Sequence, residues 1–296
     1  TNDEAMQIAG LLIQGGLQAK LIHSNDGFSL YNLIEIRYFL DCLKQNDESY
    51  AMVPDEWNIA KRRLIDEYRN STNLDICLNL INDFEATNPR TKYKTDLDIF
   101  IRESKLEDFS IGKAETIYVS TMHKAKGRQY DNVYIMLDDF NIITEENMRL
   151  LYVAMTRAKN NLIIHSNKNY FSFIKTEGIE RINDYETYLQ PERLAIQLGY
   201  KDVWLDYFLN CQRQISGLNC GDILTINDDS CYDQKGQEVL RFSKQFTEQI
   251  VEMEKKGYIP KEAMIRFIVY WQRENTDYEI KIILPQVYFE KVNKPI

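Results

Sequence analysis

The chain has 296 residues, of which 44% are hydrophobic and 27% charged, a composition that can fill the core of one large domain or about two ordinary ones. Its 45 acidic and 36 basic side chains give a net charge of −9, which argues against a protein that coats nucleic acid non-specifically. Any site for a polyanion must therefore be a local cluster of basic residues.

The sequence predicts neither a targeting segment nor a metal site built from cysteines. No apolar run reaches the roughly 18 residues of a membrane helix, and the first residues do not resemble a signal peptide. The five cysteines are scattered and have no zinc-ligand spacing. We expect a cytoplasmic protein with reduced thiols, no metal site and no membrane partner.

The first 44 residues alternate between helix and strand patterns. Residues 3–14 place Ala5, Ala9 and Leu12 at helical spacing, and Gly15 and Gly16 are typical of a helix end. Residues 19–24 predict a short buried strand, and residues 30–44 a second amphipathic helix. Helix, strand and helix in this order indicate an open α/β sheet.

Residues 45–111 differ from the first 44 residues. They contain three amphipathic helical patterns in succession, which indicates a helical insertion. Strand patterns return at 116–121 and 132–137. Thr144 is a plausible N-cap for the helix that follows, in which we expect Tyr152 and Met155 to face the core. Residues 161–166 predict one more buried strand, ending in a core or rim histidine, His165.

The C-terminal part has a mixed pattern. Residues 191–218 predict one or two helices, and from residue 219 two hairpins flank a helix capped at Ser243. This small α+β module could be a docking domain for protein or nucleic acid, or a structural cap on the rest.

A cluster of cations lies between the two middle strands. Thr121, His123, Lys124, Lys126 and Gly127 follow the first of these strands, with Arg128 and Gln129 next. Donors and a glycine at a strand end suit contacts to phosphate. From these residues alone, a solvated surface loop with a tight turn is the preferred interpretation, and a phosphate contact stays open.

The second basic feature is Arg157, at the end of the helix that Thr144 begins. Taken alone, an arginine there is what the helix dipole favours, so a structural role stays open.

Together the two segments resemble a known family. "TMHKAKGRQYD" is similar to the fifth motif and "RLLYVAMTRAK" to the sixth motif of superfamily 1 DNA helicases of the UvrD/Rep type, in the same order and with similar spacing. Residues 1–40 resemble the start of that family's second RecA-like motor domain.

The resemblance implies a site for ATP shared between two motor domains, with magnesium. Arg157 matches the arginine that the second domain supplies to the γ-phosphate, where it would stabilise charge on the transferred group. Lys126 and Gly127 would lead toward the nucleotide. Gln129 stands where many relatives have a glutamate that contacts the ribose, so the nucleotide contact here lacks that charge.

The resemblance also implies a track for single-stranded DNA. Thr121 and His123 match positions that contact the strand, and Lys124 and Lys126 would add positive charge to the same loop. Glu35 matches an acidic residue of a further short motif, although a solvated surface position is an equal alternative for it.

The implied fold is α/β: a RecA-like parallel-sheet domain with a short helical insertion and a small C-terminal α+β accessory module. We expect the motor domain in residues 1–44 and 112–168, the insertion in 45–111, a helical connector in 169–216 and a β-rich domain in 217–296. The insertion is shorter than the duplex-gripping domain that the family carries at this point.

A phosphate-binding loop of the form G-x-x-x-x-G-K-[ST] is missing from the sequence. We therefore expect a C-terminal fragment of an ATP-dependent DNA helicase, inactive without the N-terminal motor domain of the same parent protein. The alternative is a non-catalytic helicase-like scaffold that binds single-stranded nucleic acid or protein.

Overall fold

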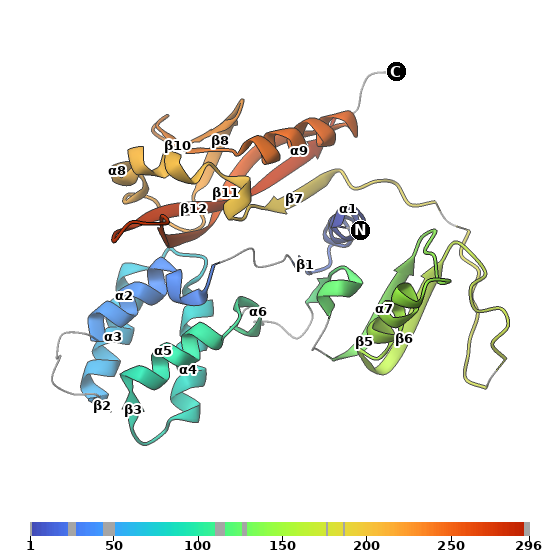
Figure 1. The fold of residues 1–296 in the computed structure, drawn as a ribbon, viewed down its shortest axis with the longest axis horizontal. Helices are drawn as coiled ribbons and strands as arrows, with labels where there is room; N and C mark the ends of the chain where they lie inside the picture. Colours follow the sequence, from blue (N-terminus) through green and yellow to red (C-terminus); the bar gives the residue numbers. More distant parts are fainter. Residues whose placement is uncertain are drawn as a thin grey trace. The chain divides into compact units, whose positions relative to one another are not determined.

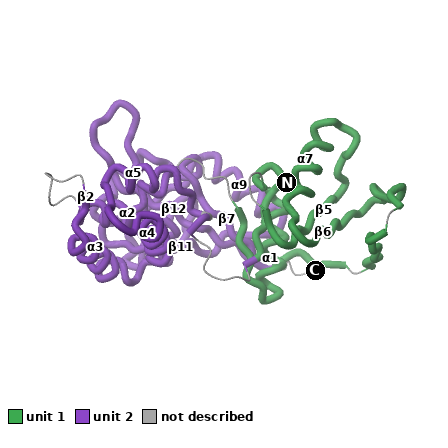
Figure 2. Tube along the Cα trace, turned by 90° about the horizontal axis from the view of Figure 1, so that it is seen from below, with its two compact units in different colours: residues 1–24, 117–191 green, residues 25–116, 192–296 purple. Residues whose placement is uncertain are grey.

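The computed structural model describes residues 2–22, 28–43, 51–109, 116–125, 129–175, 177–185 and 187–292. They form two compact units (Figure 2): unit 1 comprises residues 1–24 and 117–191, and unit 2 comprises residues 25–116 and 192–296. The expected domain boundaries stay a prediction. In the division into compact units, the helical residues 45–111 and the C-terminal module belong to the same unit, unit 2.

Unit 1 is built from two pairs of parallel strands and their helices. Its elements are α1 (Asn2–Gln14), β1 (Ala19–Leu21), β4 (Ile117–Val119), the 3-10 helix η2 (Met122–Ala125), β5 (Tyr130–Leu137), α7 (Glu145–Met155) and β6 (Ala158–Ser166). Strand β1 pairs with β4, and β5 pairs with β6, both in parallel. Strands form at each of the predicted places 19–24, 116–121, 132–137 and 161–166, with boundaries shifted by a few residues, and residues 23 and 24 lie outside the described part of the chain. The expected burial is wrong for β6, which is largely exposed together with His165, and β1 is only half-buried.

Two small cores hold unit 1. Helix α1 packs its Ala5 and Ala9 against Val119 of β4, and ends at Gln14, two residues before Gly16, whose φ of +80° suits a glycine. Helix α7 lies across β5 and β6 (Figure 1) and buries Leu151 and Ala154 against Ile135 and Leu137. The helix thereby covers one face of the β5–β6 pair.

The expected core face of α7 is partly wrong. Met155 packs beside the core, but Tyr152 is 69% exposed, and Ala154 takes the buried place. The apolar residues 148, 151, 152 and 155 do share a helical stripe, but the sheet contacts the adjacent stripe, through residues 151, 154 and 155.

Unit 2 combines a helical layer with a large antiparallel sheet. The helical part consists of η1 (Leu30–Asn32), α2 (Ile34–Leu43), α3 (Pro54–Glu67), α4 (Leu74–Thr87), α5 (Lys94–Glu103) and α6 (Leu106–Phe109), with the short pair β2 (Ala51–Met52) and β3 (Lys92–Tyr93). The three amphipathic helices predicted between 45 and 111 are confirmed as α3, α4 and α5. Their core is aromatic: Trp57 lies 5.2 Å from Phe39 and 5.9 Å from Phe84, ring centre to ring centre.

The second part of unit 2 is a six-stranded sheet in the order β10-β9-β8-β11-β12-β7, with α9 against β11. Its elements are β7 (Arg193–Gln197), η3 (Tyr200–Asp202), η4 (Leu205–Asn210), α8 (Gln212–Ile215), β8 (Ile223–Asn227), β9 (Ser230–Tyr232), β10 (Glu238–Arg241), α9 (Lys244–Lys255), β11 (Tyr258–Gln272) and β12 (Glu279–Lys291). The second predicted hairpin, β11 with β12, and the Ser243 cap, which accepts from the Phe246 N–H at 3.2 Å, are confirmed. The first predicted hairpin, of residues 219–229 with 236–242, is wrong in its pairing, because β9 lies between β8 and β10 and pairs with both.

The helical prediction for residues 191–218 is wrong at its start. Residues 193–197 form β7, an edge strand that pairs with β12 in the register Ile196 to Val287. The rest of the stretch holds the short 3-10 helices η3 and η4 and the four-residue α8, so residues 169–216 are not the helical connector that was expected.

Contacts between the two parts make unit 2 one body. Leu33 forms a bridge with Val269 of β11, and the Asn73 side-chain amide donates to the Arg266 carbonyl oxygen at 2.9 Å. The rings of Phe28 and Phe267 lie 5.0 Å apart. The described residues therefore form a mixed α/β structure with parallel pairs and a large antiparallel sheet.

Candidate nucleotide and nucleic-acid site

The loop after β4 holds three of the predicted DNA-contacting residues. Thr121 is half-buried, and its carbonyl oxygen accepts from the Lys124 N–H at 3.0 Å, which starts the turn of η2. His123 is exposed on this turn. The Lys124 Nζ lies 3.4 Å from the side-chain oxygen of Asn2, at the start of α1. The loop thus presents one exposed imidazole and one partly covered ammonium group.

The next predicted residues are only partly described. Lys126 and Gly127, like Arg128, lie outside the described residues. Gln129 is exposed and directly precedes Tyr130, the first residue of β5.

Arg157 lies one residue past the C-cap of α7. Thr144 caps the start of this helix, accepting from the Asn147 N–H at 3.3 Å, as the sequence predicted. At the other end, the Arg157 Nε donates to the Val153 carbonyl oxygen at 2.9 Å, and its Nη2 lies 3.1 Å from the Thr156 hydroxyl. The last carbonyl groups of a helix carry partial negative charge and lack helical partners, so they attract the guanidinium group.

Two contacts bring the fifth-motif and sixth-motif segments together. The Tyr130 N–H donates to the Arg157 carbonyl oxygen at 2.8 Å, so the start of β5 adjoins the turn between α7 and β6. Met122 of η2 packs against the core that α7 forms with β5. The loop with His123 and the helix that leads to Arg157 therefore share one core.

Glu35 is not a surface residue. It is completely buried in unit 2, where its Oε1 accepts from the Ser71 hydroxyl at 2.5 Å. Burial raises its pKa above the usual value, against the lowering effect of Ser71 and the nearby Cys220 thiol. Burial likewise raises the thiol pKa of Cys77 and Cys220. The solvated alternative for Glu35 is wrong, and its surroundings are those of a buried polar junction.

Sequence reasoning gave no role to Met122, Asn2 or Tyr130, although Met122 and Tyr130 lie within the quoted fifth-motif segment. Met122 carries a usable signal, because a single apolar residue between Thr121 and His123 is typical of a side chain that anchors a loop. Neither the Asn2 contact nor the Tyr130 hydrogen bond leaves a local pattern, since both depend on how distant segments pair.

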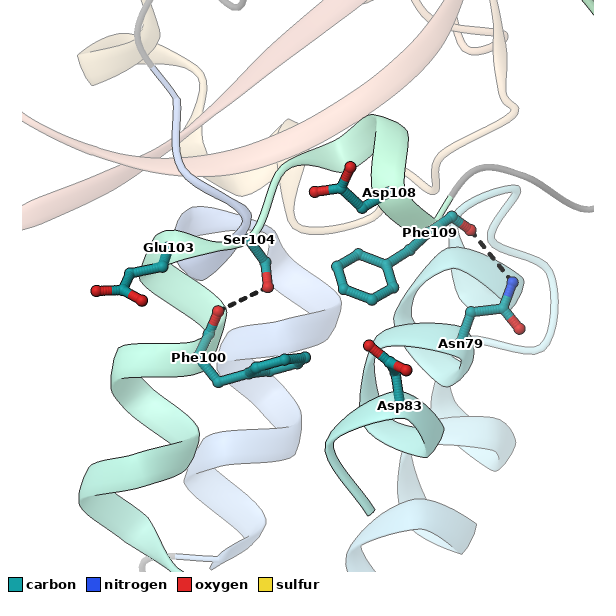
Figure 3. Close-up of a pocket in the computed structure, with 7 residues that line it drawn as sticks. All are labelled: Asn79, Asp83, Phe100, Glu103, Ser104, Asp108 and Phe109. Carbon is teal, nitrogen blue, oxygen red and sulfur yellow. Dashed lines mark hydrogen bonds between the residues drawn. The ribbon is translucent and has the colours of Figure 1, made fainter. Parts of the chain in front are cut away.

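A separate cavity of about 600 Å³ opens in the helical part of unit 2 (Figure 3). Its lining residues are Asn79, Asp83, Phe100, Glu103, Ser104, Asp108 and Phe109. The rings of Phe100 and Phe109 point into it, with their centres 6.1 Å apart. Three carboxyl groups and no basic side chain in the lining make it unsuited to phosphate.

The described residues were found to hold neither a candidate metal cluster nor a membrane-spanning helix. Within that part of the chain, no group of three or more His, Cys, Asp or Glu side chains could hold a metal ion. None of the helices that the structure describes is both long and apolar enough to cross a membrane.

Comparison with known proteins defines the class. Residues 34–169 match the family described as the UvrD-like helicase C-terminal domain, a span that holds both basic segments. This chain therefore contains a UvrD-like helicase C-terminal region. Among individual proteins it is similar to the Gabija protein GajB of Bacillus cereus (strain VD045), with 41% identity over 59 residues, 20% of this chain and 12% of GajB.

Proposed function

We propose that this chain is the second motor region of an ATP-dependent DNA helicase, which couples ATP hydrolysis to movement along a single strand and to duplex unwinding. The observation that best supports this function is the 2.8 Å hydrogen bond from Tyr130 to Arg157. It ties the strand that follows the cation-rich loop to the arginine expected at the γ-phosphate. A single rigid core under both segments would let a change at the nucleotide reach the DNA contacts.

We further propose that β1, β4, β5 and β6 belong to one RecA-like sheet. Parallel pairing of β1 with β4 and of β5 with β6 supports this proposal, as does the 6.2 Å distance between the rings of Tyr118 in β4 and Tyr130 in β5. Loops at the ends of parallel strands are common places for phosphate contacts.

The residues present suit the nucleotide's phosphate and ribose but not its metal. Arg157 offers guanidinium donors whose direction is fixed by the Val153 carbonyl oxygen, and a phosphate oxygen could replace the Thr156 hydroxyl as acceptor. The exposed Gln129 can accept a hydrogen bond from a ribose hydroxyl. Magnesium and the phosphate-binding loop would come from the other motor domain, and bound ATP supplies the phosphoryl group that is transferred to water.

On the DNA side, we propose that Thr121, His123, Lys124 and Lys126 contact the backbone of the single strand. His123 is the most accessible of the described residues in this set. Lys124 would exchange its contact with Asn2 for a phosphate.

Binding of fluorescein-labelled single-stranded DNA, followed by anisotropy across a salt series, tests the proposal on this chain. We expect affinity to fall with salt as counterions are released, and His123→Ala to weaken it about tenfold, the effect of losing one hydrogen bond to a charged group. His165→Ala is the matched control, since His165 is an exposed histidine of the same unit on β6.

A second pair of variants separates the roles. Arg157→Ala should leave DNA binding nearly unchanged, because the arginine serves the nucleotide. If instead the two histidine variants bind alike, or Arg157→Ala abolishes binding, the assignment fails and the non-catalytic scaffold becomes the better description.

A further inference from the structure

The guanidinium group of Arg157 is held at the end of α7 by two acceptors. Its Nε donates to the Val153 carbonyl oxygen at 2.9 Å, and its Nη2 donates to the Thr156 hydroxyl oxygen at 3.1 Å. The Thr156 hydroxyl donates in turn to the same carbonyl oxygen, at 2.9 Å. These three hydrogen bonds close a small ring in which the guanidinium group, the hydroxyl and one backbone carbonyl fix one another.

The Thr156 hydroxyl has a fixed direction within this ring. A hydroxyl group carries one donor and two acceptor positions, and the donor of Thr156 is directed at Val153. That carbonyl is one of the last four of α7, which the helix itself leaves without helical partners. Threonine is also branched at Cβ, which limits its rotamers and allows this bond to the carbonyl three residues earlier. The hydroxyl therefore presents a lone pair to Arg157 from a set position.

Both contacts of Arg157 use the same edge of the guanidinium group. The N–H of Nε and one N–H of Nη2 are parallel, and they meet Val153 and Thr156. The second N–H of Nη2 and the N–H groups of Nη1 form the opposite edge, called the outer edge below, and are directed away from those two residues. A planar group held in this way cannot turn about its Cζ–Nε bond without losing the bond to Thr156. The ring thus sets the direction of the outer edge.

The outer edge suits a phosphate better than the inner one. Its two parallel N–H groups form the fork that binds phosphate in a bidentate manner. A phosphate that displaced the Thr156 hydroxyl would cost the ring one hydrogen bond, whereas a phosphate at the outer edge leaves the ring complete.

A fixed guanidinium group matters most while phosphate charge develops. Donors that already point at the developing charge stabilise it without reorientation at the moment of reaction. Thr156 and Arg157 are both half-buried, so water competes only partly for the hydrogen bond between them. Loss of the hydroxyl would therefore loosen the arginine without removing its charge.

We propose that Thr156 is a positioning residue for Arg157, whose hydroxyl fixes the guanidinium plane so that the outer edge faces the γ-phosphate during the transfer. Thr156 itself does not touch the nucleotide, and it acts only through the arginine. This inference rests on the proposed function, because it assigns Thr156 a part in the role proposed there for Arg157.

Arginine side-chain NMR tests the ring in this chain without any nucleotide. Rotation about the Cζ–Nε bond exchanges the two Nη nitrogens, and its rate is measured on chain labelled with ¹³C and ¹⁵N in arginine, with the Arg157 signals assigned through Arg157→Lys. Thr156→Val should speed this exchange about tenfold, the effect of losing one hydrogen bond to a charged group. Thr156→Ser should keep it slow. Arg149, exposed on the same helix, is the internal reference and should not change.

ATP turnover by the parent protein that carries the phosphate-binding loop tests the role itself. Thr156→Val should lower kcat about tenfold with KM nearly unchanged, because the positioned arginine acts on the transition state. Thr156→Ser should recover most of the loss. Thr144→Ala weakens the same helix at its other end and should leave kcat within about twofold. In Thr156→Val/Arg157→Ala, the loss should not exceed that of Arg157→Ala alone.

The outcomes separate this inference from the proposed function. If Arg157→Ala lowers turnover but Thr156→Val leaves either kcat or the Nη exchange unchanged, the role of Thr156 is overturned and the proposed function stands. An equal loss of kcat in Thr144→Ala would also overturn it, since helix stability would then explain the effect. If Arg157→Ala itself leaves turnover unchanged, the proposed function fails and the role of Thr156 fails with it.

Discussion

The backbone N–H of Tyr130 and the carbonyl oxygen of Arg157 are joined by a hydrogen bond of 2.8 Å. Tyr130 begins β5 and Ala158 begins β6, so this bond closes the parallel pair at the end where both strands start. Any displacement of the Arg157 backbone therefore moves the start of β5, which lies one residue from Gln129. This link is the structural basis for expecting nucleotide and DNA contacts to be coupled.

Replacing Arg157 tests its proposed place at the nucleotide. In the presence of the phosphate-binding-loop domain, Arg157→Ala should lower DNA-stimulated ATP turnover by about 10³-fold, the usual contribution of an arginine that stabilises a transferred phosphoryl group. Arg157→Lys should recover little, because lysine lacks the planar fork. Steady-state phosphate release measures both.

The matched control for Arg157 is Arg149, an exposed arginine on the same helix that pairs with Glu145 at 2.5 Å. Arg149→Ala should change ATP turnover less than about twofold, since exposed ion pairs of this kind contribute under 1 kcal/mol. Equal losses in the two variants would assign Arg157 a merely structural role at the end of α7.

Glu35 should give the stability of unit 2 a distinctive pH dependence. Burial raises its pKa above 4.5, so the folded state holds the proton more tightly than the unfolded state. The contribution of Glu35 to the free energy of unfolding is fully present below pH 4.5. It is lost as the pH rises through the pKa of the folded state, at up to about 1.4 kcal/mol per pH unit.

Glu35→Gln, which stays neutral, should remove this contribution. Its stability relative to the unaltered chain should therefore increase as the pH rises above 4.5, as measured by urea unfolding at a series of pH values. Glu248→Gln on the exposed side of α9 is the control and should show no such trend. A constant difference between Glu35→Gln and the unaltered chain at all pH values would contradict the prediction.

Gly221 fills a position where a methyl group has no room. Its φ is +107°, and a Cβ there would lie 2.9 Å from the Thr72 Cγ2. Gly221→Ala should lower the free energy of unfolding by about 2–3 kcal/mol through strain and crowding together. Gly236→Ala, at a φ of +74° with open space around it, should cost only the backbone part, about 1 kcal/mol.

Thr72→Ser separates the two effects at Gly221, because it removes the crowded methyl group but keeps the hydroxyl. Thermal unfolding of the double variant Thr72→Ser/Gly221→Ala should show partial recovery relative to Gly221→Ala. If the serine substitution recovers nothing, backbone strain alone accounts for the loss.

Thr144 should stabilise the helix that leads to Arg157. Its side chain accepts from the Asn147 N–H at 3.3 Å, so Thr144→Ala should destabilise the protein by about 1 kcal/mol, whereas Thr144→Ser should cost little. Circular dichroism during urea unfolding measures both. A loss of equal size in the serine variant would point to the methyl group instead of the cap.

The sequence predicted those elements whose signals are local. Helices α3, α4 and α5 follow apolar spacing within single segments, and the caps at Thr144 and Ser243 are set by their own side chains. Strand β7 was missed because its state is decided by β12, about 90 residues later, with which Ile196 pairs opposite Val287. Propensity within residues 193–197 cannot report such a partner.

The candidate site likewise combines features that a local sequence pattern can predict with features that depend on distant segments. Motif resemblance proposes His123 and Arg157 as site residues. The bond from Tyr130 to Arg157, by contrast, arises from the register of a parallel pair, and the burial of Glu35 arises from the packing of α2 beside Ser71 and Cys220. Both depend on tertiary structure, which leaves no fixed spacing in one sequence.

The interleaved make-up of the two units bears on how the protein responds to a protease. Unit 1 comes from residues 1–24 and 117–191 and unit 2 from 25–116 and 192–296, so the chain passes between the units three times. A single nick near Tyr185 or Leu189, both exposed, cuts residues 192–296 from the rest of the chain, but these residues still pack with residues 25–116 inside unit 2. The nicked protein should therefore migrate as two fragments on a denaturing gel yet elute as one particle from a sizing column.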